Sequence, residues 1–486
     1  MLAEELKMRL QAANELILWP DSHPPEFTTV TTDSRNVARG ALFVAYAGSS
    51  TDSHTFLPHV AQAGAAAAIA EHPVAGLTIP VIEVRNGRHA AAIAAALHFG
   101  DPAASLDLLA VTGTNGKTTS VHLLRHLFGE QAPAGSIGTL GAVDGDGNVL
   151  PGTENLTTPG PVELQATLAA LRDRGIKTVA MEASSHSLHQ DRLYGLRVKA
   201  AIFTNLTRDH LDYHQTVDAY LRAKLRLAEY LVPGAPAVIN YDDRSWDRLP
   251  EAVPRLTFGI TSPADVRATA IGGNARGMRF TITYKGESAP VELPLLGRFN
   301  VENALGAAAA ALSLGHPLAG IAQRLASAPQ VPGRMERLSA EPCVVLRDYA
   351  HTPDALERAL GALRPLTRGR LIAVFGCGGD RDRGKRPVMG GIAARDADLA
   401  IVTSDNPRTE DPQRILDDVE EGMGDTPHLR IVDRRSAIAR AVSIARPDDT
   451  IVLAGKGHET YQVVGKEKLP FDERDIVADA VQARRK

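Results

Sequence analysis

The 486-residue sequence has few cysteines, no excess of basic residues and no long apolar run. Two cysteines, Cys343 and Cys377, are too few for a disulfide framework and fit a reducing compartment. The formal net charge of −4 argues against a nucleic-acid partner, because nucleic-acid-binding proteins carry a basic surface. No run approaches the roughly 18 apolar residues of a membrane-spanning helix. The opening MLAEELKMRLQAANEL mixes acids and bases, unlike a secretion signal. We expect a cytoplasmic protein without membrane insertion.

The length predicts about three domains, at roughly 150 residues each. The first covers residues 1–101, where short strand-like runs alternate with two Ala-rich stretches, 61–70 and 90–98, that we predict to be helical. It ends at HFGDP, because Gly and Pro there interrupt the pattern. We predict a small α/β domain.

The remaining chain alternates strand-like and helix-like runs, which is typical of parallel sheets covered by helices. Over 102–334 we predict a central, mostly parallel sheet of the phosphate-loop type, with a β-meander at 265–296. Over 335–486 we predict a Rossmann-like parallel sheet. The predicted fold class is therefore α/β with three domains.

The stretch VTGTNGKTTS (111–120) predicts a phosphate-binding loop. It links the strand-like LDLLAV to the helix-like KTTSVHLLRHLFG, and a helix N-terminus favours phosphate because its first N–H groups have no partner within the helix. Lys117 can reach the outer phosphates of a nucleotide and Thr118 can bind Mg²⁺. The usual first glycine is replaced by Val111, which we place at the strand end and not in the turn. A solvated turn is the alternative.

A second loop, FGCGGDRDRG (375–384), also follows a strand-like run. A dinucleotide-binding fingerprint would need glycine at the position of Arg381, so hydride transfer is not predicted. An Arg- and Asp-rich loop at a strand end indicates either a site for a charged substrate or a solvated turn.

Several longer stretches resemble one enzyme family. TGTNGKTT resembles the phosphate loop of the Mur ligases and the folylpolyglutamate synthetases. Further stretches in all three domains favour the Mur ligases: MEASSHSLHQDR (181–192), TNLTRDHLDYH (204–214), LGRFNVENALGA (296–307), DYAHTPDAL (348–356), GGDRDRGKRPVM (378–389), SDNPRTEDP (404–412) and AGKGHETYQ (454–462). Together they are similar to the branch that makes the UDP-N-acetylmuramoyl tripeptide.

The resemblance implies an ATP-dependent amide ligase of peptidoglycan synthesis. Its three domains would bind, in chain order, the UDP group, ATP and the amino acid, and a monomer is expected. ATP would phosphorylate the D-Glu carboxylate of UDP-N-acetylmuramoyl-L-alanyl-D-glutamate, and an amino acid would then attack the acyl phosphate. DNPR (405–408) is similar to the branch that adds meso-diaminopimelate. Lysine or ornithine are alternatives, followed by folylpolyglutamate synthesis and a nucleotide switch without ligase activity.

The resemblance also implies catalytic residues and a magnesium site. Lys117, His210 and Lys224 would be catalytic. The Mg²⁺ ligands would be Thr118, Glu182, His210 and Lys224, the last as an N6-carboxylysine formed with CO₂. From its helix alone, Lys224 looks like an ordinary exposed lysine; carbamylation requires it to lose its proton, which implies a lowered pKa. Asp209 is a plausible partner of His210.

Nucleotide contacts are expected from two domains. Asn303, which we place at a helix start, would contact the base, Asp348 the ribose and Arg334 a phosphate, and His351 would help to position the nucleotide. The loop residues expected to bind ATP are Gly113, Thr114, Asn115, Gly116, Lys117, Thr118 and Thr119.

The UDP-sugar peptide is expected between the first two domains. Ser34 would lie on the uridine side. The pyrophosphate, sugar and peptide would contact Thr157, Thr158, Ser184, Gln190 and Arg192. The loop 45–54 departs from the His-Gln pair of some relatives, so its uracil contacts are left open.

The amino acid is expected at strand ends of the third domain, where open α/β sheets bind ligands. The residues implied are Arg381, Asp405, Asn406, Pro407, Arg408, Gly455 and Glu459. The fork-shaped guanidinium of Arg408 suits the distal carboxylate of diaminopimelate, and Glu459 would meet the distal ammonium. A loop ion pair of Arg408 with Glu410 or Asp411 is the alternative.

Overall fold

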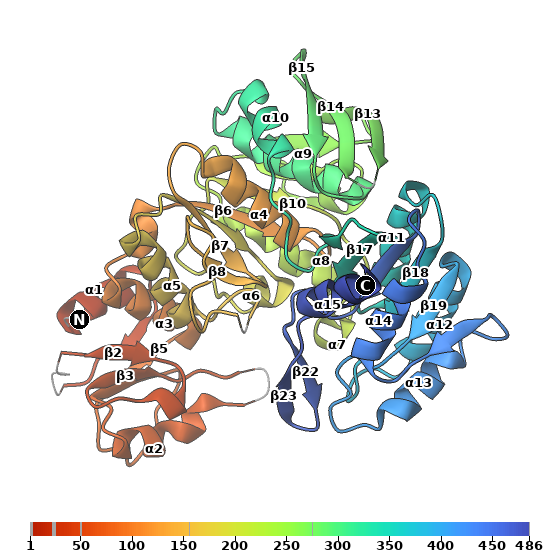
Figure 1. The fold of residues 1–486 in the computed structure, drawn as a ribbon. Helices are drawn as coiled ribbons and strands as arrows, with labels where there is room; N and C mark the ends of the chain where they lie inside the picture. The colour runs from red at the N-terminus through yellow and green to blue at the C-terminus, as the bar shows by residue number, and fades with distance from the viewer. Residues whose placement is uncertain (1–2, 22–25, 49–50, 155, 275, 486) are drawn as a thin grey trace. The chain divides into compact units, whose positions relative to one another are not determined.

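The structure is a computed structural model, and it describes residues 3–21, 26–48, 51–154, 156–274 and 276–485. The chain divides into two compact units, which we describe separately. Unit 1 comprises residues 1–266 and 305–317, and unit 2 comprises residues 267–304 and 318–486. Figure 1 labels their helices and strands. None of the described helices is long and apolar enough to cross a membrane.

The N-terminal part of unit 1 is a sheet in the order β1-β5-β4-β3-β2. The strands are β1 (Leu16–Leu18), β2 (Thr29–Thr31), β3 (Ala41–Val44), β4 (Ala67–Ala70) and β5 (Val81–Val84), parallel except for β1. The helices are α1 (Ala3–Ala12), α2 (Leu57–Gln62) and α3 (Gly87–His98). Apolar residues of α1 and α3 share one core with the sheet, while those of α2 belong to another, and Figure 1 shows α2 on the side away from α1 and α3.

The helix expected over 61–70 is wrong, because the segment contains the end of α2 and then strand β4. Gly64 has a φ of +93°, a conformation that suits glycine and interrupts the helix. The four residues of β4 are fully buried between β3 and β5. Alanine favours helices intrinsically, but burial within a sheet overrides that preference here. The helix expected over 90–98 is confirmed by α3.

The larger sheet of unit 1 runs in the order β12-β11-β10-β6-β9-β7-β8. The strands are β6 (Asp107–Thr112), β7 (Ala134–Gly138), β8 (Gly141–Val143), β9 (Thr178–Glu182), β10 (Ala200–Phe203), β11 (Ala237–Asn240) and β12 (Arg255–Gly259). All pairs are parallel except the hairpin of β7 and β8. The helices are α4 (Lys117–Phe128), α5 (Pro161–Asp173), α6 (Ser185–His189), α7 (Leu211–His214) and α8 (Val217–Leu225). The predicted mostly parallel sheet is confirmed.

Helix α8 ends at Leu225, although VDAYLRAKLRLAEYLV (217–232) has the apolar spacing of a longer amphipathic helix. The Thr216 hydroxyl accepts the N–H of Ala219 and caps its start. After Leu225 the chain tightens into a 3₁₀ helix over Arg226–Tyr230. Arg226 donates to the Leu188 carbonyl at 2.7 Å and also pairs with Asp191, so contacts with α6 and the loop after it hold this turn.

Unit 2 begins with the meander β13 (Val266–Asn274), β14 (Gly277–Tyr284) and β15 (Glu287–Leu293), which confirms the strands expected there. Helix α9 (Arg298–Ser313) belongs partly to each unit, and α10 (Leu318–Ala326) follows it.

The C-terminal sheet of unit 2 has the order β16-β17-β21-β18-β19-β20. The strands are β16 (Glu336–Ser339), β17 (Val344–Asp348), β18 (Leu371–Phe375), β19 (Leu399–Val402), β20 (His428–Arg430) and β21 (Thr450–Ala454), with only β16 antiparallel. Helices α11 (Pro353–Leu363), α12 (Lys385–Asp396) and α13 (Pro412–Glu420) cover one face, and α14 (Arg434–Ile444) and α15 (Glu473–Arg485) cover the other. A hairpin, β22 (Tyr461–Val464) and β23 (Glu467–Pro470), projects beyond the sheet (Figure 1). The predicted α/β fold class is confirmed.

Candidate functional site

The loop between β6 and α4 has the geometry of a phosphate cradle. Gly116 caps α4 with a φ of +86°. Gly113 has a φ of +145°, and a Cβ there would lie 1.9 Å from the Thr204 hydroxyl oxygen, so only glycine fits. Val111 is buried inside β6, as we predicted. The remaining loop is pinned by Asn205, which accepts the N–H groups of Thr114 and Asn115 at 2.7 and 3.0 Å.

Two lysines meet on one carbonyl of this loop. The Gly113 oxygen accepts Lys117 Nζ at 2.9 Å and Lys224 Nζ at 2.7 Å. Lys224 is 1% exposed, which overturns its interpretation as a surface lysine. Its ammonium lies 4.4 Å from the centre of the Tyr220 ring, one helical turn earlier, and no carboxylate of the described chain is ion-paired with it. Burial, and then the charge of Lys117, hold the pKa of Lys224 well below its ordinary value.

His210 lies at the start of α7, within a group of aromatic side chains. Its backbone is left-handed, with a φ of +51°, and its Nε2 lies 3.5 Å from Asp209 as expected. Its ring is 4.8 Å from that of His186 and 6.1 Å from that of Tyr220. Burial lowers the pKa of His210, which favours the neutral imidazole. His186 was not singled out from the sequence, although it stands inside the quoted stretch 181–192.

Glu182 connects the end of β9 to the predicted sugar-peptide residues. It is 1% exposed, and its carboxylate accepts the Thr139 N–H at 2.8 Å, while its backbone oxygen accepts the Thr158 hydroxyl at 2.8 Å. The same hydroxyl lies 3.4 Å from that of Ser184, and the Thr158 carbonyl accepts Arg192 at 2.7 Å. Further links at 3.3 Å between the Thr139 and Thr157 hydroxyls and at 2.8 Å between Arg192 and Gln190 complete the network. The structure therefore brings these predicted residues together.

Arg192 also approaches the N-terminal sheet of unit 1. Burial lowers the pKa of Arg192, and the charge of Arg88 on α3 lowers it further. Arg88 itself stacks on Tyr46, with its guanidinium 4.8 Å from the ring centre. Neither arginine is ion-paired with a carboxylate of the described residues, so the two form a cationic position that suits an anionic ligand. Sequence reasoning missed Arg88, which follows the cap of α3 and carries no motif.

Ser34 begins the short 3₁₀ helix Ser34–Asn36, which Asp33 caps, and no described bond joins it to the network above. Positions 49–50 of the loop 45–54 lie outside the described residues. Within the described part, Glu71 holds the loop by accepting the Ala47 N–H at 3.1 Å.

The residues expected on the nucleotide side of unit 2 cluster at the end of β17. Asp348 accepts the N–H groups of Met335 and Ala350 at 2.7 and 2.9 Å, and burial raises its pKa. The Arg334 guanidinium lies 4.7 Å from the Tyr349 ring centre, and His351 packs edge-on against the same ring at 4.6 Å. The carboxyl end of β17 therefore carries aromatic rings that could stack on a base, together with the charged groups of Arg334 and Asp348.

The prediction that Asn303 stands at a helix start is wrong, because α9 begins at Arg298. It is buried in the second turn, where it donates to the Asn300 side chain at 3.0 Å. Asn300 in turn donates to the Leu296 carbonyl at 2.7 Å. The turn into the helix lies earlier, at Gly297, whose φ of +91° suits glycine and whose carbonyl accepts the Asn300 N–H at 3.0 Å.

A compact polar group follows β19 and β21. Asn406 donates to Glu459 at 2.9 Å, and the buried Lys456 contacts both of them, at 3.0 and 3.1 Å. Asp405 is 7% exposed, and its Oδ2 has no hydrogen-bond partner among the described residues. That oxygen would lie 2.4 Å from a Cβ at Gly455, so glycine is required there. Burying a carboxylate oxygen without a hydrogen-bond partner costs free energy. Such an unpaired oxygen is typical of a functional group that binds a ligand.

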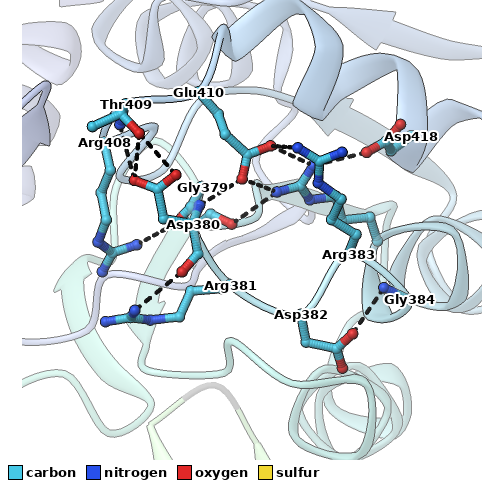
Figure 2. A network of polar contacts seen from close by, with 12 residues as sticks. Gly379, Asp380, Arg381, Asp382, Arg383, Gly384, Arg408, Thr409, Glu410 and Asp418 are labelled. Atoms are coloured by element: carbon cyan, nitrogen blue, oxygen red, sulfur yellow. Dashed lines mark hydrogen bonds and ion pairs between the residues drawn. The ribbon is translucent and has the colours of Figure 1, made fainter.

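Arg408 forms no ion pair with Glu410 or Asp411, the alternative that the sequence left open. Figure 2 shows why: Glu410 turns away, accepting the Asp380 N–H at 2.5 Å and pairing with Arg386 at 2.9 Å and Arg383 at 3.1 Å. The Arg408 guanidinium donates to the Gly379 carbonyl at 2.9 Å and makes no ion pair in the described chain. Its backbone is clamped by the hairpin, donating to the Val463 carbonyl at 3.0 Å.

The other predicted residues of this group lie on the same loops. Arg381 donates to the Asp380 carbonyl at 3.1 Å (Figure 2), and the Pro407 carbonyl would lie 1.9 Å from a Cβ at Gly379. Arg386, which sequence reasoning missed, is 0% exposed and also pairs with Asp418 at 2.7 Å. It stands inside the quoted stretch GGDRDRGKRPVM (378–389), which is the one signal that the sequence offered.

Comparisons with known proteins match both the part of the chain that carries the phosphate loop and the part that carries the Arg408 loop. Family profiles match for the Mur ligase middle domain over residues 111–311 and for the Mur ligase glutamate ligase domain over residues 333–457. The UDP-N-acetylmuramoyl-L-alanyl-D-glutamate–2,6-diaminopimelate ligase of Geobacillus thermodenitrificans (strain NG80-2) is 42% identical over 95% of this chain and 96% of its own length. The ligase of the same name from Thermosynechococcus vestitus (strain NIES-2133 / IAM M-273 / BP-1) is 43% identical over 95% and 94%.

A solved structure with that enzyme name is also similar, with a TM-score of 0.69 and 34% identity over 97% of this chain and 100% of the other. The extent and level of identity define the class: the chain belongs to the Mur ligase family.

Proposed function

We propose that this protein is the ATP-dependent ligase that adds meso-diaminopimelate to UDP-N-acetylmuramoyl-L-alanyl-D-glutamate, in cytoplasmic peptidoglycan precursor synthesis. The relatives that carry this enzyme name, at about four tenths identity over nearly the whole chain, support the ligase class. The observation that carries the choice of amino acid is the Arg408 guanidinium, which Glu410 leaves without an ion pair.

The reaction has two chemical steps. The γ-phosphoryl group of ATP passes to the D-Glu carboxylate, giving an acyl phosphate and ADP. The amine of the incoming amino acid then attacks the acyl carbon, the C–O bond to phosphate breaks, and the amine loses a proton. Both steps gather negative charge, so cations near the transferring group should dominate catalysis. Lys117, whose Nζ donates to the Gly113 carbonyl of the loop at 2.9 Å, would supply one of them.

The Mg²⁺ ion of this reaction would be held by oxygen-rich residues of unit 1. Thr118 and Glu182 offer the hard oxygen donors that Mg²⁺ prefers, and the lowered pKa of His210 favours the neutral ring, in which one nitrogen is unprotonated and can bind a metal ion. When bound, the ion would neutralise phosphate charge.

Lys224 fits the carbamate reading because it is buried, is paired with no described carboxylate and has a lowered pKa. The neutral amine would attack CO₂, forming an N–C bond and releasing one proton to water. The product carries oxygen donors, which a lysine amine cannot offer to Mg²⁺.

The UDP-sugar peptide would lie along the network from Glu182 to Arg192. Its pyrophosphate suits Arg192 and Arg88, because both cations lack a described carboxylate partner and burial strengthens their attraction for an anion. Asn303, Arg334, Asp348 and His351 would contribute nucleotide contacts from unit 2.

Diaminopimelate is favoured over lysine and ornithine by its second carboxylate. A free guanidinium can bind that group through two parallel hydrogen bonds, whereas lysine and ornithine would leave it unpaired. Folylpolyglutamate synthesis would not explain the N-terminal sheet, proposed to bind the UDP group, or the Arg408 loop, proposed to bind a second carboxylate. A nucleotide switch would not require the buried Lys224.

Phosphate release by the purified protein tests the class. We expect release from ATP to require both the UDP-N-acetylmuramoyl dipeptide and diaminopimelate. Release with ATP alone would indicate a nucleotide switch, and release with a folate and glutamate would indicate the other ligase.

A further inference from the structure

Lys456 is a fully buried cation that contacts Asn406 and Glu459, two of the residues proposed to bind the amino acid. It follows β21 and Gly455, and its side chain is 0% exposed. Its Nζ donates to Asn406 Oδ1 at 3.0 Å and to Glu459 Oε2 at 3.1 Å. Two aromatic rings lie near the ammonium, Tyr461 at 5.9 Å and Phe471 at 6.0 Å from their centres. Burying a lysine is costly, so its retention requires these partners.

The contacts of Lys456 fix the orientation of the Asn406 amide. Its Oδ1 accepts from Lys456 and also from the Val463 N–H at 2.8 Å, so the oxygen must face these two donors. The opposite end, Nδ2, therefore points at Glu459 and donates to Oε2 at 2.9 Å. With its oxygen and nitrogen exchanged, the amide would face the ammonium with its own donors.

Glu459 is thereby anchored through one oxygen only. Oε2 receives hydrogen bonds from Lys456 and Asn406, whereas Oε1 has none among the described residues. The side chain is 18% exposed, so ligand atoms can reach it. Anchoring one carboxylate oxygen restricts rotation of the group and presents the other as a fixed acceptor.

We propose that Lys456 is a positioning residue that holds Glu459 so that Oε1 accepts the distal ammonium of the amino acid. The proposal rests on the proposed function, in which Glu459 meets that ammonium. Without Lys456 the carboxylate would keep one donor, the Asn406 amide, and could rotate toward water. The specificity for a diamino acid would then depend on two separate devices, Arg408 for the distal carboxylate and Lys456 with Glu459 for the distal ammonium.

Two analogues separate these devices. L-Lysine keeps the distal ammonium and lacks the carboxylate, whereas L-2-aminopimelate keeps the carboxylate and lacks the ammonium. In Lys456→Met, we expect KM for diaminopimelate and for lysine to rise about tenfold or more, the loss of a charge-assisted contact. KM for 2-aminopimelate, KM for ATP and kcat should stay within about threefold. An analogue that turns over too slowly is measured as a competitive inhibitor of diaminopimelate.

Lys468→Met is the matched control, because Lys468 is exposed on β23 and its Nζ lies 4.2 Å from the centre of the same Tyr461 ring. It should leave all constants unchanged. If Lys456→Met does not fold, Lys456→Gln keeps an amide NH₂ donor without the charge and should show the same selective but smaller rise. An equal loss for all three amino acids, or an unchanged or lower KM for diaminopimelate, would overturn the positioning role. A wild-type enzyme that ignores diaminopimelate would instead overturn the proposed function.

Discussion

Replacing Arg408 with alanine removes the contact that we propose decides the amino acid. In the free protein this side chain donates one hydrogen bond, to the Gly379 carbonyl, and makes no described ion pair. The fold should lose no more than about 1.5–3 kcal/mol, the net value of one hydrogen bond that involves a charged group. A charge-assisted pair with a substrate carboxylate is worth roughly 1.5–3 kcal/mol, which at about 1.4 kcal/mol per tenfold is about ten- to over a hundredfold.

We therefore expect kcat/KM for diaminopimelate to fall by about that factor in Arg408→Ala, mostly through KM. KM for ATP and for the UDP-sugar dipeptide should change little, and kcat/KM for lysine should stay the same or rise, because lysine never had the contact. The assay is steady-state phosphate release with each amino acid. Arg414→Ala, an exposed arginine on the neighbouring helix α13, is the control. Equal losses for diaminopimelate and lysine would refute the assignment.

The remaining predictions concern the phosphate loop, the buried lysine and the loop network of Figure 2. Lys117→Ala should lower kcat by about a thousandfold or more, since it removes the cation beside the transferring group, and a near-normal rate would reject the loop as the nucleotide site. Lys224→Ala should remain folded by circular dichroism and be nearly inactive, with partial rescue by short carboxylates; full unassisted activity would exclude the carbamate. Glu410→Gln should lower the melting temperature, because Arg386 loses a partner while fully buried. Hydrogen bonding from Arg386 lowers the pKa of Glu410 to about 2, so the difference between wild type and variant should be full above about pH 4.5 and shrink as the pH falls toward 2. A difference that grows with acid would contradict this origin.

The parts of the fold that local sequence determines were predictable. The apolar run LDLLAV located β6, and the alternation of strand-like and helix-like runs indicated the parallel sheets, while the glycine-bearing turn after β6 predicted a phosphate loop. The Ala-rich β4 was missed, because burial between β3 and β5 overrides the intrinsic preference of alanine for helices.

The features that depend on tertiary packing were not predictable from residue pattern. Lys224 has the spacing of a surface residue, and only the approach of α8 to the Gly113 carbonyl buries it. The partner of Arg408 depended on where Glu410 turns, which is set by Arg386 from another helix. Lys456 was visible in AGKGHETYQ, but its burial and its two partners were not. The three-domain boundaries and the roles of the site residues stay predictions.

The most direct test of the central claim is a competition experiment with the purified protein. ATP, Mg²⁺ and UDP-N-acetylmuramoyl-L-alanyl-D-glutamate are supplied with equal concentrations of meso-diaminopimelate, L-lysine and L-ornithine, and the products are identified by mass spectrometry. We predict a UDP-N-acetylmuramoyl tripeptide that carries diaminopimelate, formed together with one ADP and one phosphate. A tripeptide that carries mainly lysine or ornithine would contradict the assignment of Arg408, and ATP hydrolysis without any tripeptide would contradict the ligase itself.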